Sequence, residues 1–387
     1  MTALASAEHA APPRTDRRLL TGIFAALGIV MAVWGTRMPA VQAAAHLTAG
    51  ELSIVLLGAA AGMVGGLQLG GQLADRHGPS RLLVGPTVLF GTALVVLGQC
   101  RTLPTLALGA GVFGLAHGLL DVGANTCAVN CERAARRKIM SSLHCAYSVG
   151  ALGGAALAAT TTWLPYSVLF TTVGAVTVLA ALGVVPLIRA AQHLDAPTGK
   201  PRTEDEGAPS SSRATVWLLG ALAAGCLLGE GAAVDWSAVH LHSLHSSEAT
   251  AAAAYALYSA AMATGRFFGD RLTTRYGAPT VVRAGAALAT VGLGAGLAIG
   301  TAPAALLGWT ALGLGLSTAV PSLISAAGRG GPRAVAAVAS TGYLGLLTGP
   351  AAIGALASIT SVPAALALPV LLAAAVSLAA HRALEPR

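Results

Sequence analysis

The sequence predicts an all-α membrane protein whose twelve transmembrane helices form two six-helix halves. Three observations lead to this fold class: the composition, the spacing of the apolar segments and an internal repeat. Of the 387 residues, 55% are hydrophobic and only 10% are charged, which is too apolar for a soluble globular protein. We therefore expect the lipid bilayer to surround most of the chain.

Twelve apolar segments are long enough to cross a bilayer, which takes roughly 17 to 25 helical residues. The predicted spans are 19–45, 52–74, 82–99, 103–130, 139–163, 166–188, 214–241, 249–268, 281–300, 302–327, 334–360 and 363–380. The first follows a polar stretch rich in arginine, and its length exceeds the apolar core of a signal peptide. We interpret it as an uncleaved span.

The positive charges indicate the orientation. All but two of the 23 Lys and Arg residues fall before the first span, after the last one or in alternate connections, and cytoplasmic loops retain such charges. The exceptions are Arg37 and Arg101. Both termini are therefore predicted to be cytoplasmic, and this topology accounts for the net charge of +8 without any nucleic-acid partner.

The chain divides at a polar stretch, residues 189–213, whose charges, Pro, Gly and Ser cannot form a hydrophobic core. The predicted organisation is a cytoplasmic tail (1–18), a first half (19–188), this flexible cytoplasmic linker, a second half (214–380) and a cytoplasmic tail (381–387). LADRHGPSR after the second span matches LTTRYGAPT after the eighth at an offset of 199 positions, as does Ser141 with Ser340. Parallel repeats are typical of transporters in which a cavity between the halves opens to either side in turn.

Ionisable residues inside the hydrocarbon region are costly and usually mark function. In GLAHGLLDVGAN, the side chains of His117, Asp121 and Asn125 share one helix face with glycines. We therefore expect a polar stripe facing the bundle interior, with Asp121 as the first candidate for carrying a proton. The alternative is a structural hydrogen bond from Asp121 to a neighbouring helix. Glu230, in GCLLGEGAAVDW, is the second candidate for coupling or solute contact, with a structural role equally open.

Three further residues are candidates for the solute pathway. Arg37 either contacts the solute or a carboxylate, or extends to the nearby membrane surface. His144 and Tyr147 in the fifth span are candidates for hydrogen bonding in the cavity, against a role in packing alone. The sequence contains no Ser/His/Asp cluster, metal motif or phosphate-binding loop, so we expect neither an enzyme nor a cofactor nor a bound metal.

GGQLADRHGPSR resembles the signature of the major facilitator superfamily, G-x-L-x-D-R-x-G-x-x-R. The matching residues are Gly71, Leu73, Asp75, Arg76, Gly78 and Arg81. The resemblance implies the major facilitator fold. The stretches GEGAAVDWSAVHL and GRFFGDRLTTRYGA further resemble a bacterial subgroup related to fucose permease and to the rhizopine-uptake protein MosC. That subgroup implies a multi-pass carrier of a small solute, such as a sugar or polyol, in the bacterial inner membrane, and we expect it to work as a monomer.

The signature also has a physical interpretation. Gly71 permits close helix packing and Gly78 permits a tight turn. Asp75 is placed to accept from a facing helix N-terminus or to pair with a loop arginine, which makes a latch on one conformational state. The alternative is that these charges only enforce topology, as Arg76 and Arg81 do in any case.

The second copy of the signature differs at one position. Thr274 stands where Asp75 stands in the first copy. A second latch therefore has to use Asp270, with Arg271 and Arg275 beside it, or be weaker.

The leading hypothesis is a proton-coupled secondary transporter, a symporter, that moves a small solute by alternating access. Proton-driven efflux of hydrophobic compounds is an alternative, because the residues do not set a direction. A non-transporting membrane sensor is the alternative from another class. It would need a soluble output module, and the linker is the only long extramembrane stretch.

Overall fold

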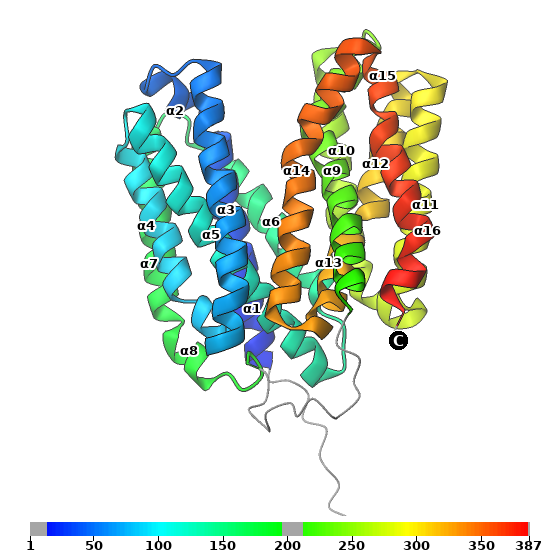
Figure 1. Ribbon diagram of the computed structural model, residues 1–387. Helices are drawn as coiled ribbons and strands as arrows, with labels where there is room; N and C mark the ends of the chain where they lie inside the picture. Colours follow the sequence, from blue (N-terminus) through cyan, green and yellow to red (C-terminus); the bar gives the residue numbers. More distant parts are fainter. Residues whose placement is uncertain (1–13, 196–211, 386–387) are drawn as a thin grey trace, which may run out of the picture.

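The computed structural model describes residues 14–195 and 212–385, and every regular element in these ranges is helical. The first half contains α1 (Arg14–Thr36), α2 (Met38–Ala44), α3 (Ala49–His77), η1 (Pro79–Leu82), α4 (Gly85–Gln99), α5 (Leu103–Ala135), α6 (Met140–Thr160), α7 (Tyr166–Gly183) and α8 (Val185–Ala190). The second half contains α9 (Arg213–Ser243), α10 (Glu248–Tyr276), α11 (Ala278–Ile299), α12 (Ala302–Leu316), α13 (Ala319–Ala327), η2 (Gly328–Gly330), α14 (Pro332–Ile359), α15 (Val362–Ala365) and α16 (Ala367–Leu384). Figure 1 shows them as two helical bundles side by side.

Each half has six long helical segments. Eleven segments in the described part of the chain are long and apolar enough to cross a membrane. The remaining one, α10, has 29 residues, about 43 Å at 1.5 Å per residue, and runs beside α9 and α12 (Figure 1). It is less apolar because its second half carries Arg266, Asp270 and Arg271. The predicted all-helical membrane fold is confirmed.

The internal repeat of the sequence is also a repeat of the structure. In the first half α1 packs on α6, α3 on α5 and α4 on α7; in the second, α9 packs on α14, α10 on α12 and α11 on α16. The matching glycines of the repeated turn, Gly78 and Gly277, follow α3 and α10 with φ of 87° and 80°. Only glycine adopts such a conformation without strain, so the turn explains both residues.

Helix boundaries differ from the prediction near the ends of the halves. α1 begins at Arg14, inside the predicted tail, and α16 continues to Leu384. Residues 1–13, 196–211 and 386–387 lie outside the described residues, so the predicted tails and linker are covered only in part. The first linker residues pack against the first half: Leu194 is buried, and the Asp195 carboxylate accepts from the backbone and hydroxyl of Ser80 at 3.0 and 2.6 Å.

The two halves meet at one end of the molecule. α3 packs against α14 and α6 against α10. Figure 1 shows the bundles close together where α1 begins and α16 ends, and diverging toward the opposite side. We call the first the termini-bearing end and the other the far end. Among the described residues, the hydrogen bonds and ion pairs between the halves lie toward the termini-bearing end, on these four helices and where the end of α5 and the segment after it meet α13.

Candidate functional site

The polar stripe predicted in the fourth span lies on α5 and is buried. His117, Asp121 and Asn125 are 3%, 8% and 2% exposed. A Cβ at Gly114 would lie 1.9 Å from the backbone oxygen of Ala59, so the glycine beside the stripe lets α3 pack directly on α5 and does not line a cavity. The stripe is thereby fixed inside the molecule rather than facing lipid.

The side chains of the stripe reach both a neighbouring helix and the other half. The Asn125 amide donates to the Asp121 backbone oxygen at 2.9 Å, and its oxygen lies 3.3 Å from Nε2 of His144 on α6. The Tyr343 side chain, on α14 of the second half, lies beside the Asp121 carboxyl and makes an edge contact with the His117 ring, with centroids 6.5 Å apart. Asp121 therefore lies at the interface between the halves.

Arg266 is a site residue that the sequence reasoning missed, because the charge count assigned it to the loop after the eighth span. It is only 6% exposed. Its Nη2 lies 3.5 Å from the Glu230 carboxylate on α9, and its Nη1 donates to the Ser148 hydroxyl on α6 at 2.7 Å. Its Nε has no hydrogen-bond partner in the part of the chain that the structure describes. The signal was present in the sequence, since position 266 falls inside the predicted span 249–268.

These contacts form one polar path across the interface. It runs from Glu230 through Arg266 to Ser148, whose hydroxyl donates to the His144 backbone oxygen at 3.1 Å, and on to Asn125. The predicted residues His144 and Glu230 thus belong to one network although they come from different halves. Tyr147, the neighbour of Ser148 on α6, is partly buried against the hydrophobic core.

Arg37 lies away from this path. It is 7% exposed, and its Nη2 donates to the backbone and hydroxyl oxygens of Thr161, the residue that ends α6 at the far end. A cation that binds the free carbonyls of a helix C-terminus stabilises that helix. This contact within the first half gives Arg37 a structural partner, while its buried Nε has no hydrogen-bond partner among the described residues. Among the described residues, no three His, Cys, Asp or Glu side chains come close enough together to hold a metal ion.

The first copy of the signature joins α3 to α14 at the termini-bearing end. The Asp75 carboxylate lies 3.1 Å from Nε of Arg333, and the two side chains are 42% and 62% exposed. A Cβ at Gly71 would lie 2.6 Å from the side chain of Ala336, so the two helices touch there. The signature's other cations, Arg76 and Arg81, are exposed.

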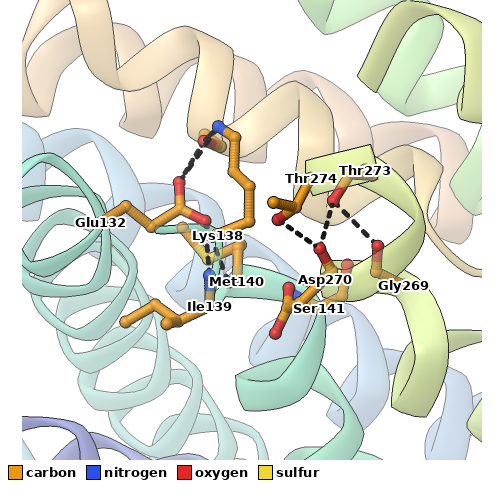
Figure 2. A network of polar contacts seen from close by, with 10 residues as sticks. Glu132, Lys138, Ile139, Met140, Ser141, Gly269, Asp270, Thr273 and Thr274 are labelled. Carbon is orange, nitrogen blue, oxygen red and sulfur yellow. Dashed lines mark hydrogen bonds and ion pairs between the residues drawn. The ribbon is translucent and has the colours of Figure 1, made fainter. Parts of the chain in front are cut away.

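The second copy joins α10 to α6 in a different way. The two carboxylate oxygens of Asp270 accept from the backbone amides of Ser141 and Ser142, at 2.9 and 3.0 Å, and so cap the first turn of α6. Thr274 donates to the Asp270 backbone oxygen within its own helix at 2.6 Å (Figure 2). The neighbouring cations take no part in this cap. Arg271 is exposed, and Arg275 lies over the ring of Tyr276.

Glu132 is a second residue that the sequence reasoning missed. It is 6% exposed at the end of α5. One carboxylate oxygen accepts from the backbone amides of Ile139 and Met140 at 2.9 and 3.1 Å. The other accepts from the Ser325 hydroxyl on α13 and lies 3.6 Å from Nζ of Lys138. Figure 2 shows this network beside the Asp270 cap. The signal in the sequence is a single acid within the run CERAARRK.

Known proteins resemble this chain over most of its length. The family described as Major Facilitator Superfamily matches residues 19–330. The uncharacterized transporter y4wD of Sinorhizobium fredii is 34% identical over 359 residues, covering 88% of this chain and 92% of that protein. The membrane protein MosC of Rhizobium meliloti is 26% identical over 382 residues, covering 91% and 90%.

Solved structures share the fold. The major facilitator transporter FucP in the outward conformation superposes with a TM-score of 0.77 at 15% identity, covering 95% of this chain and 98% of that one. The proton:xylose symporter XylE gives a TM-score of 0.73 at 13% identity, covering 95% and 94%. At these identities the likeness concerns the fold.

Proposed function

The chain belongs to the Major Facilitator Superfamily, and from this premise we propose that it is a proton-coupled symporter that carries a small polar solute by alternating access. As a member of this family it is a multi-pass secondary transporter and not an enzyme. The resemblance to MosC and to fucose permease is confirmed. The solute, the coupling ion and the direction belong to the proposal.

One observation carries the proposal. Two carboxylates inside the membrane-spanning part, Asp121 and Glu230, lie where the halves meet, and residues of both halves surround them. Ionisable groups at this depth are retained mainly where they bind a solute or relay a proton, and the interface between repeats is the usual place for such sites.

The two carboxylates have different partners, and we therefore assign them different roles, one in carrying the proton and one in binding the solute. Glu230 is ion-paired with Arg266, whereas the Asp121 carboxyl has the side chains of Asn125 and Tyr343 beside it and no ion-pair partner among the described residues. A carboxyl group without an ion-pair partner gains or loses a proton without breaking such a pair, so we assign the proton to Asp121.

The Glu230–Arg266 pair is assigned to the solute. Glu230 accepts hydrogen bonds, while the unpartnered Nε of Arg266 is free to donate one. The two together suit the hydroxyl groups of a sugar or polyol. FucP and XylE, described as proton symporters of fucose and xylose, support this solute class. An ion pair between a buried arginine and a partly exposed glutamate suits a polar solute better than a hydrophobic drug, which favours symport of a polar solute over drug efflux.

The closed termini-bearing end fits one stage of alternating access. If both termini are cytoplasmic, as the charge pattern predicts, the contacts between the halves close the cytoplasmic side and the protein is in its outward-open state. We assign the Asp75–Arg333 pair and the Asp270 cap as latches on this state, because separating the halves breaks both.

Transport by reconstituted protein tests the proposal. A thermal-shift screen of sugars and polyols first identifies a bound solute, and its accumulation in proteoliposomes is then driven by a pH gradient. Asp121→Asn is expected to abolish pH-driven accumulation but to retain exchange of labelled for unlabelled solute. Asp235→Asn, which changes an exposed acid on α9, is the matched control and is expected to retain both. Accumulation at the wild-type level in the Asp121→Asn protein would overturn the assignment.

A further inference from the structure

A cavity of about 430 Å³ lies between the two halves at the termini-bearing end, apart from the proposed solute path. The end of α5 and the segment after it form one wall, and the end of α10 with α13 and η2 forms the other. Five of its lining residues are basic: Arg133, Arg136, Arg137, Lys138 and Arg329.

Among the described residues that line this cavity, Glu132 is the only acid, and both of its carboxylate oxygens already have partners. Glu132 accepts from two backbone amides and from the Ser325 hydroxyl, and it is ion-paired with Lys138. It therefore offsets the charge of Lys138, and no second acid among the described lining residues stands beside Arg136, Arg137 and Arg329. Cations gathered around one cavity repel one another and raise the local concentration of anions.

The backbone brings the cations of the two halves together. Arg136 ends α5 in the left-handed conformation, with φ of 48°, and turns the chain so that Arg137 follows along the cavity. From the other half, Gly328 lies against α5 so closely that a Cβ would be 2.3 Å from Val129 Cγ1. This approach places Arg329, the next residue, beside the arginines of the first half.

Membrane topology does not explain this convergence. A loop stays on the cytoplasmic side when it carries positive charges near the membrane, and these charges do not need to surround one cavity. The corresponding cavity on the other side, between α3 and α14, has about 360 Å³ and is lined by Gln68, Gln72, Arg333 and Ala336. Its single basic residue is paired with Asp75. At the repeat offset of 199 positions, Arg136 and Arg137 correspond to Val335 and Ala336, so the basic cluster is not part of the repeated framework.

We propose that this basic cavity binds a phosphate group, carried by an anionic lipid headgroup or by a soluble phosphate compound, and that the bound anion keeps the termini-bearing end closed. Guanidinium groups match phosphate oxygens in charge and in bidentate geometry. Since both halves supply lining residues, separating them dismantles the site. An anion that binds only the closed state shifts the equilibrium toward it.

A binding experiment with two arms distinguishes the two sources of phosphate. Protein purified in phospholipid-free detergent is titrated with inorganic phosphate and ATP in one arm and with cardiolipin in the other. Arg136→Gln combined with Arg137→Gln is expected to weaken binding about tenfold for each arginine removed, because each loses a charge-assisted hydrogen bond. Arg189→Gln combined with Arg382→Gln removes the same charge from exposed positions at the same end, outside the cavity, and is expected to bind as the wild type does.

Each outcome bears on the proposal. Binding in the soluble arm alone assigns a soluble phosphate compound, binding of cardiolipin alone assigns a lipid headgroup, and binding in both shows that the site recognises the phosphate group itself. Absence of binding in both arms, or equal weakening in the control variant, would overturn the site.

A distance measurement tests the second part of the proposal. Spin labels on the two halves at the termini-bearing end are expected to move closer together when the anion is added to the wild type, and to remain unchanged in the cavity variant. Binding without a change in the label distances would refute the effect on closure. Neither measurement uses a pH gradient or a transported solute, so both are independent of the proposed symport.

Discussion

Replacing Asp270 with Asn is expected to open the termini-bearing end much further than replacing Asp75 with Asn. Both oxygens of Asp270 accept a backbone hydrogen bond at the start of α6, across the interface between the halves. An asparagine keeps one acceptor oxygen and has no charge, so one charge-assisted bond and the attraction to the helix N-terminus are lost. Such bonds contribute about 1.5 to 3 kcal/mol.

The magnitude follows from the burial of the two acids. Asp270 is partly buried, so we take about 2 kcal/mol, which shifts the equilibrium toward the open form about 30-fold. The Asp75–Arg333 pair is 42% and 62% exposed. Exposed pairs contribute at most about 1 kcal/mol, a shift of about fivefold.

Pulsed electron paramagnetic resonance measures the shift directly. Spin labels at Arg189→Cys and Arg382→Cys, on the first and second half, are introduced after the five native cysteines have been replaced. The long-distance population is expected to rise strongly with Asp270→Asn and slightly with Asp75→Asn. Equal effects, or a larger effect of the Asp75 substitution, would refute the assignment of the Asp270 cap as the stronger contact.

Three further predictions concern packing, the ion pair and the orientation. Gly62→Ala is expected to destabilise the protein by about 1 to 3 kcal/mol, because the added Cβ would lie 2.0 Å from a backbone oxygen of α5. Gly153→Ala, whose Cβ would have no atom within 4 Å, is the control. Equal melting temperatures of the two variants in a thermal melt would contradict the close packing of α3 on α5. Glu230→Gln leaves the buried Arg266 without its charged partner and is expected to weaken solute binding by about 1 to 3 kcal/mol, measured by titration. An unchanged Kd would show that the Glu230–Arg266 pair does not bind the solute. A fluorescent protein fused after Arg387 is expected to mature in the cytoplasm, whereas an active alkaline phosphatase at the same position would reverse the orientation.

Most of the helices were predictable from the sequence because long apolar runs between polar connections mark where a chain crosses a bilayer. The repeat was predictable because both copies of the turn keep a glycine, Gly78 and Gly277. Other residues would be strained at the positive φ of these positions. The start of α1 at Arg14 was not predicted, because a helix extends beyond the apolar core wherever its polar residues remain in water or at the membrane surface.

The candidate site was predictable only within single helices. Helical periodicity places Asp121 and Asn125 on one face, and the structure agrees. The contact of Arg266 with Ser148 joins residues 118 positions apart in different halves, and no local pattern encodes it. Arg266 was counted as a loop charge without regard to its depth in the predicted span, so the cation that pairs with Glu230 among the described residues was missed.

The two signature copies show how a duplicated framework acquires unequal contacts. Gly71 and Asp75 of the first copy correspond to Asp270 and Thr274 of the second, so the acid lies one helical turn farther from the end of its helix in the second copy. At the outer position, Asp75 is exposed and pairs with the exposed side chain of Arg333. At the inner position, Asp270 accepts from backbone amides of α6, which the helix holds in place. We therefore expect the Asp270 cap to cost more to break than the Asp75–Arg333 pair, although the same helix pairs were duplicated.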